Sequence, residues 1–141
     1  MMLRPEAVRQ RLLRLEEVVS RLEELKHLDV EALRRSVRDA WAVERGLQLA
    51  AEIVFDAGNH ILSGHFGVSA KDYEDILALL AAHGVIEPAV HERLAGLGGL
   101  RNLLVHDYLR LDSARTAEAL ARAPGDFSAF TTAVHRWLAS L

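Results

Sequence analysis

The stretch RNLLVHDYLR, residues 101–110, gathers side chains that can act on a phosphodiester. Arg101 is permanently charged and can hold a phosphate or stabilise the extra negative charge of a phosphoryl transition state. Histidine accepts and donates protons near neutral pH, which makes His106 a candidate general acid or base. Asn102 precedes it by four residues and can hydrogen-bond the ring. Together these groups suit metal-free RNA cleavage, in which a 2′-hydroxyl attacks the adjacent phosphate.

The same residues also have a purely structural interpretation, which their spacing leaves open. Arg101 can pair with an acidic residue such as Glu44, and His106 can be a packed histidine. Glu44 falls on the apolar stripe of its expected helix, where a carboxylate is costly unless it is paired. We therefore expect Glu44 to neutralise Arg101 or to help shape the same cleft.

A second set of polar residues is less specific. Asp56 and His60 are four residues apart and could ligate a metal, but two ligands are a weak case, and a surface pair is the simpler interpretation. The sequence therefore predicts no metal site. The arginines at 34, 35 and 38 form a basic patch that is either a solvated helix face or an RNA contact.

Composition limits the classes of protein that fit. The chain has 141 residues, enough for a single domain spanning 1–141, and no cysteine, which excludes disulfides, thiolate nucleophiles and cysteine-ligated zinc. Its net charge of -3 provides no global attraction to nucleic acid, so an RNA contact must come from a local patch. The sequence shows neither a membrane-spanning apolar run nor a secretory signal, so we expect a cytoplasmic protein with no membrane association.

Apolar residues recur at helical spacing almost everywhere, which predicts an all-α fold, an antiparallel bundle of four to five helices. The fourth expected helix contains three glycines. Either it stays continuous and its glycines allow close packing of another helix or a second copy of the chain, or it breaks and restarts near Leu100. The expected helices cover about 5–27, 29–64, 69–84, 88–110 and 112–137, the last interrupted at the PGD of 124–126.

On a continuous helix, Asn102 and His106 point about 100° and 140° away from Arg101. They share a strip with Ala95 and Gly99, whose small size suits close approach by another helix. The divergence of Arg101 and His106 is poor for a site on one helix but workable where two helices meet. The geometry therefore favours a homodimer.

Arg101, His106 and Tyr108 form the pattern R-x4-H-x-Y, which resembles the motif of the HepT-like toxins, a branch of the HEPN superfamily of all-helical ribonucleases. Asn102, directly after the arginine, also fits the HEPN pattern. The stretch WAVERGLQLAAEIVFDAGNHIL, residues 41–62, is similar to the second helix of those proteins. The resemblance covers most of the chain.

This resemblance implies a homodimeric, metal-independent endoribonuclease toxin with a HEPN-like fold. Arg101 and His106 of both subunits would line a catalytic cleft at the dimer interface, with RNA as the substrate. It also implies a partner antitoxin of the MNT nucleotidyltransferase type, which uses ATP and Mg²⁺ to attach AMP to Tyr108 and so neutralises the toxin. The toxin itself needs no cofactor in this scheme.

Two other functions remain open at this stage. The chain could be a non-catalytic helical subunit that binds a nucleotidyltransferase and contributes to its substrate site, or a plain dimerisation module. Arg101 and His106 favour the nuclease, whereas the net charge of -3 mildly favours the other two.

Overall fold

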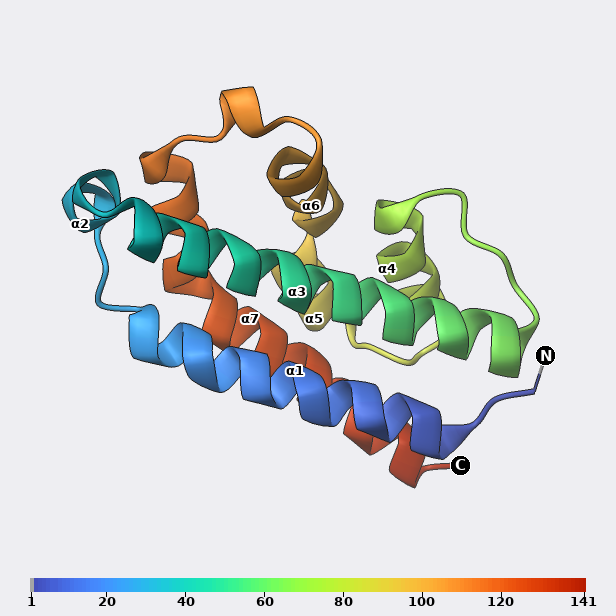
Figure 1. Ribbon diagram of the computed structural model, residues 1–141. Coiled ribbons are helices and arrows are strands. Elements are labelled where there is room, and N and C mark those ends of the chain that lie inside the picture. The colour runs from blue at the N-terminus through green and yellow to red at the C-terminus, as the bar shows by residue number, and fades with distance from the viewer. Residues whose placement is uncertain (1) are drawn as a thin grey trace.

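Three long helices, α1 (Pro5–Leu25), α3 (Val37–Ile61) and α7 (Ser113–Ala139), pack along one another and form the spine of the protein (Figure 1). The computed structural model describes residues 2–141, and within them all regular structure is helical, as the sequence predicts. The apolar stripes of these helices face inward at the expected spacing. The fully buried residues include Leu12, Leu15, Leu47, Leu120 and Phe130.

Short polar side chains start most of the helices. Asp29, the N-cap that the sequence suggests for the second helix, accepts a hydrogen bond from the amide of Ala32 at 2.9 Å. Of the two candidates for the cap of the last helix, Asp112 and Ser113, it is Asp112 that accepts, from the amide of Arg115 at 2.7 Å. Ser69, whose spacing from Asp72 resembles a capping box, does not cap α4 (Tyr73–Ala82); Asp72 does, because it accepts from the amide of Asp75 at 2.8 Å.

The helix expected over residues 29–64 is divided. Ser36 has an extended backbone and separates α2 (Val30–Arg35) from α3, whose first turn it caps through its hydroxyl. On one continuous helix over 29–64, apolar periodicity places Val37 and Trp41 in the buried stripe, but these residues are 60% and 69% exposed. The face of α3 that packs on the core is instead the one that carries Val43 and Leu47.

The helix expected over residues 88–110 is also divided, as the alternative interpretation of its glycines anticipated. Gly96 adopts a left-handed conformation (φ +88°) between α5 (Pro88–Leu94) and α6 (Leu97–Val105), so the restart lies three residues before Leu100. A short 3₁₀ helix, η2 (Tyr108–Arg110), then leads to α7. The break turns α6 so that it packs against α3 and α4 (Figure 1).

The interruption expected at 124–126 is absent, and α7 continues through Pro124. A proline inside a helix removes one backbone hydrogen bond. Here Pro124 is buried, and the next two residues contact α5: Gly125 lies against Arg93, and the Asp126 carboxylate pairs with the Arg93 guanidinium at 3.0 Å. Tertiary packing therefore retains a helix that local propensity would end.

None of the described helices combines the length and the apolar character needed to cross a membrane.

Candidate active site

Arg101 lies on the side of α6 that faces α3. Its Nε donates to Oε1 of Glu52 at 3.2 Å, and 15% of the Arg101 side chain is exposed, against 43% for Glu52. A partly buried guanidinium is well matched by a carboxylate partner of this kind. The ion pair therefore fixes the arginine while leaving its other nitrogens free to point outward.

The ring of Tyr73 in α4 supports the same guanidinium. The Arg101 Cζ lies 4.8 Å from the ring centroid, a cation–π contact, and the ring in turn contacts Phe55 with 4.7 Å between centroids. Gly98 allows α4 to approach this closely, since a Cβ at that position would lie 3.0 Å from the Cβ of Tyr73. The Gly98 amide also donates to Glu74 at 2.7 Å, which ties the start of α6 to α4.

His106 meets Arg101 because α6 ends before it. The Nη1 atom of Arg101 lies 3.4 Å from His106 Nε2 and 3.4 Å from Asn102 Oδ1. His106 is the C-cap, with φ −112°, and its amide donates to the Asn102 carbonyl at 2.8 Å. The divergence of about 140° expected on a continuous helix therefore does not apply. Arg101, Asn102 and His106 come together within one chain.

The contact between Arg101 and His106 also assigns roles to the ring nitrogens. A guanidinium has donors and no acceptor, so Nε2 can take part in this contact only as the acceptor. A ring nitrogen that accepts here is the atom of His106 that could also accept a proton from a substrate. Both His106 and Asn102 are exposed, so a substrate can reach them.

A groove with a volume of about 820 Å³ adjoins these residues between α3 and α4. Glu52, Tyr73 and Asn102 lie along it. The groove also contains Asp56, Asp72 and a single lysine, Lys71. Because carboxylates predominate, the groove itself does not attract phosphate, and Arg101 is the group in this area that can bind one.

Glu44 lies away from the cluster. It precedes Glu52 by eight residues, about 12 Å along the helix, and lines a separate cavity with Arg34 and Thr116. Burial raises the pKa of Glu44 above its ordinary value. The expected carboxylate partner of Arg101 is thus present on the expected helix, but it is Glu52, two turns further on.

Sequence reasoning missed Glu52 and Tyr73. Glu52 stands inside the stretch that carries the family resemblance, but periodicity alone cannot tell which of two carboxylates on one helix meets α6. Tyr73 gave no signal, since its contact with Arg101 depends on how α4 packs. Tyr108, the candidate modification residue, has its backbone in η2, while its side chain lies outside the part of the chain that the structure describes.

Asp56 and His60, the two possible metal ligands, each contact a different residue. Asp56 accepts from Arg11 Nε at 2.7 Å, and the buried His60 accepts from the Arg4 amide at 3.5 Å. Across residues 2–141, no three His, Asp or Glu side chains gather as a metal would require. In the basic patch, Arg34 pairs with Glu31 at 3.1 Å.

Comparison with known proteins places this geometry in a family. A curated relative from Aphanizomenon flos-aquae (strain 2012/KM1/D3), named tRNA nuclease HepT, is 26% identical over 121 residues, which cover 85% of this chain and 82% of that protein. The fold matches the cytosolic protein of unknown function YutE from Bacillus subtilis, with a TM-score of 0.84, 22% identity and coverage of 99% of this chain and 94% of the other.

The fold also matches a tri-AMPylated HEPN toxin of Shewanella oneidensis solved in complex with MNT antitoxin. The TM-score is 0.80, the identity is 22%, and the match covers 92% of this chain and 96% of that one. The family model described as "Ribonuclease HepT-like" matches residues 15–134, which include α3, α6 and the Arg101 cluster. The chain therefore belongs to the HepT-like ribonuclease family.

Proposed function

We propose that this protein is the toxin of a HEPN–MNT toxin–antitoxin system and that it cleaves RNA without a metal ion. The observation that carries the proposal is the cluster of Arg101, Asn102 and His106, with an exposed imidazole beside a guanidinium that Glu52 holds. The family match and the relative named tRNA nuclease HepT support a nuclease.

The chemistry follows from the cluster. His106 Nε2 removes the proton of a 2′-hydroxyl, whose oxygen then forms a bond to the adjacent phosphorus. Arg101 binds the non-bridging oxygens and stabilises their added charge. The bond from phosphorus to the 5′-oxygen breaks, and that oxygen takes a proton from a second acid. The products are a 2′,3′-cyclic phosphate and a 5′-hydroxyl.

A second copy of the chain supplies that acid in our proposal. Val37 and Trp41 project from the same face of α3 as Glu52, and both are exposed. A Cβ at Gly99 would meet nothing within 4 Å, so this side of Gly99 is open among the described residues. Leu109, three residues past His106, is 90% exposed. Exposed apolar side chains along this face of α3 and beyond the end of α6 suit a twofold dimer that brings two His106 side chains into one cleft.

The proposed antitoxin is an MNT nucleotidyltransferase that uses ATP and Mg²⁺ to attach AMP to Tyr108. The HEPN toxin of the Shewanella oneidensis complex is tri-AMPylated, which supports this class of partner. Tyr108 follows His106 by two residues, so each added AMP places a bulky phosphodiester at the mouth of the site. Inhibition then requires no unfolding.

One experiment tests the catalytic proposal. Purified protein is incubated with total tRNA in the presence of a metal chelator, and the fragment ends are analysed. We expect cleavage that leaves cyclic phosphate ends, reduced by about 10²- to 10⁴-fold in His106→Ala. Circular dichroism confirms that the variant is folded. Undiminished cleavage by folded His106→Ala protein, or cleavage that the chelator abolishes, contradicts the proposal.

A further inference from the structure

A second pocket lies on the other side of α6, between this helix and α7. Its volume is about 240 Å³, and three arginines line it, Arg93 from α5 and Arg115 and Arg122 from α7. We call it the Arg115 pocket. Its apolar floor consists of Leu47, Leu97, Leu100 and Phe127. Leu100 precedes Arg101 directly, so the pocket and the catalytic cluster are separated by about one helix diameter, roughly 10 Å.

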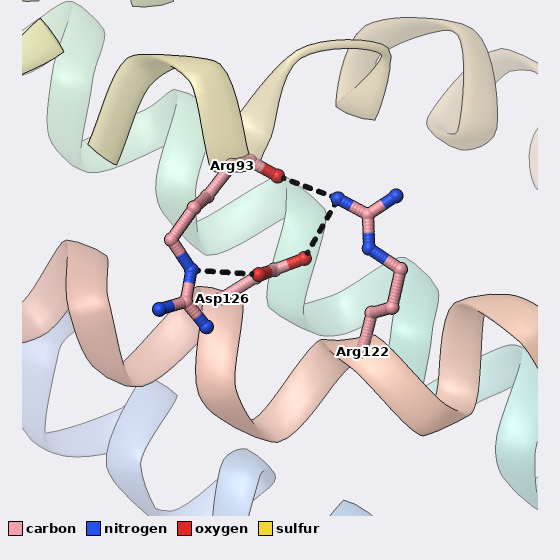
Figure 2. A network of polar contacts seen from close by, with 3 residues as sticks. All are labelled: Arg93, Arg122 and Asp126. Atoms are coloured by element: carbon pink, nitrogen blue, oxygen red, sulfur yellow. Dashed lines mark hydrogen bonds and ion pairs between the residues drawn. The ribbon is translucent and has the colours of Figure 1, made fainter. Parts of the chain in front are cut away.

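Two of these arginines are held in place by one carboxylate. Figure 2 shows Asp126 between Arg93 and Arg122, with distances of 3.0 Å to Arg93 Nε and 3.5 Å to Arg122 Nη2. Arg122 Nη2 also donates to the Arg93 carbonyl at 3.2 Å. Gly125 leaves room for this arrangement, because a Cβ at that position would lie 2.8 Å from Arg93 Nη2 and the guanidinium would have to shift. The PGD segment of α7 therefore serves to position a guanidinium.

These contacts leave donors available. A guanidinium has five N–H groups, and the contacts above use one nitrogen of Arg93 and one of Arg122. Arg115 is exposed, and its guanidinium makes no ion pair with any residue whose side chain is described. Three guanidinium groups face the carboxylates of Asp126 and Glu118, so the pocket carries a net charge of about +1.

We propose that the Arg115 pocket binds the phosphate of a nucleotide, either as one unit of an RNA strand or as a free nucleotide, with the sugar or base against the apolar floor. Arginine is the residue that binds phosphate through two parallel hydrogen bonds, and an apolar floor with a few directed donors is typical of small-ligand sites. The RNA version rests on the proposed function. It also accounts for how a chain of net charge -3 with an acidic groove beside Asn102 holds RNA: the strand is bound from the α7 side.

Binding is measured on protein that carries His106→Ala, so that the RNA stays intact. The probes are a short single-stranded RNA and AMP, each titrated at several salt concentrations. Arg115→Ala is the informative variant because the Arg115 guanidinium makes no hydrogen bond or ion pair with the described side chains. We expect RNA affinity to fall several-fold at low salt and the slope of log affinity against log salt to decrease by about 0.7, the value for one phosphate contact on a single strand.

Two further variants complete the experiment: one changes the charge of the pocket in the opposite direction, and one is a control outside the pocket. Glu118→Gln removes a negative charge from the pocket and should strengthen binding where Arg115→Ala weakens it. Arg21→Ala removes an exposed arginine of α1 that pairs with Glu24, and should change nothing. Thermal unfolding of each variant establishes that the fold is intact.

The outcomes separate the possible sources of the phosphate. Weaker RNA binding by Arg115→Ala supports an RNA unit, and weaker AMP binding with unchanged RNA binding supports a free nucleotide. Unchanged binding of both probes overturns the inference, as does a loss confined to binding of the nucleotidyltransferase, which would make the pocket a protein contact. If the unsubstituted protein cleaves RNA but Arg115→Ala binds both RNA and AMP normally, this inference fails while the proposed function stands.

Discussion

Glu52 of α3 and Arg101 of α6, which are 49 residues apart in the sequence, form an ion pair with 3.2 Å between Oε1 and Nε. The pair holds Nε of the guanidinium, while Nη1 contacts Asn102 and His106. Two edges of one planar group thus have different partners. The orientation of Arg101 is therefore set by the packing of α3 against α6.

Glu52→Gln should lower RNA cleavage by about 10-fold while changing the free energy of unfolding by about 1 kcal/mol or less, because a partly exposed pair contributes little stability. The amide can still accept from Arg101 but no longer neutralises it. Cleavage rates and urea unfolding curves check both numbers. Glu44→Gln, on the same helix and away from the cluster, is the control and should retain full activity. Equal losses in the two variants would contradict a specific role for Glu52.

Gly98→Ala should destabilise the protein by about 1–2 kcal/mol, since its Cβ would lie 3.0 Å from Tyr73 and 3.1 Å from Glu74. Gly99→Ala has the same gain in helix propensity and no close neighbour within the chain. The difference in unfolding midpoint between the two variants isolates the contact with α4. If Gly98→Ala is as stable as Gly99→Ala, then α4 does not pack on α6 as described.

Trp41→Glu should shift the protein from dimer to monomer, because it places a charge in the apolar face proposed for the interface. Light scattering at micromolar concentration measures the mass. Leu13→Glu is a matched control, since Leu13 is an exposed leucine on α1, with 59% of its surface accessible. A monomer before any substitution, or dissociation by both variants, would remove the proposed interface.

His60 should make the fold less stable as the pH falls. Burial, then the charges of Arg11 and Arg4, lower the pKa of His60 below its ordinary value of 6.5. The unfolded chain therefore takes up this proton first, and stability declines from about pH 6.5 down to the lowered pKa. His60→Gln keeps an acceptor for the Arg4 amide and should lack this part of the decline. Thermal midpoints across the pH range test it, and parallel curves for both proteins would refute it.

Tyr108→Phe should remain toxic when expressed alone but escape neutralisation by the proposed nucleotidyltransferase, because it lacks the hydroxyl that we propose as the AMP acceptor. Intact-mass spectrometry after co-expression measures the modification. We expect added AMP on the unsubstituted chain and none on the variant. AMP located on another residue would assign the modification elsewhere.

The helical class, the aspartate caps and the candidate site residues Arg101, Asn102 and His106 followed from periodicity, cap chemistry and the motif. The features that the sequence did not predict depend on tertiary packing. The apolar periodicity predicted a buried Trp41 because it treated residues 29–64 as one continuous helix. The helix breaks at Ser36, and Trp41 is exposed. Helix propensity predicted an interruption of the last helix at Pro124. The helix continues there, and Asp126 just beyond the proline pairs with Arg93 of α5. The sequence does not distinguish Glu44 from Glu52 as the ion-pair partner of Arg101. That choice depends on the direction of α6, which follows from the turn at Gly96.

The end of α6 at Val105 has a consequence for the spacing of the motif itself. Five residues along an unbroken helix is the wrong interval for two groups that must share a phosphate, since it turns them to different sides. The interval works here because His106 is the C-cap, where φ is −112° and not the usual helical value of about −63°, so its ring does not follow the direction of the helix. The end of the helix is thus part of this cluster, and a substitution near Asp107 that brought φ of His106 to the helical value would move the ring away from Arg101 without altering either residue.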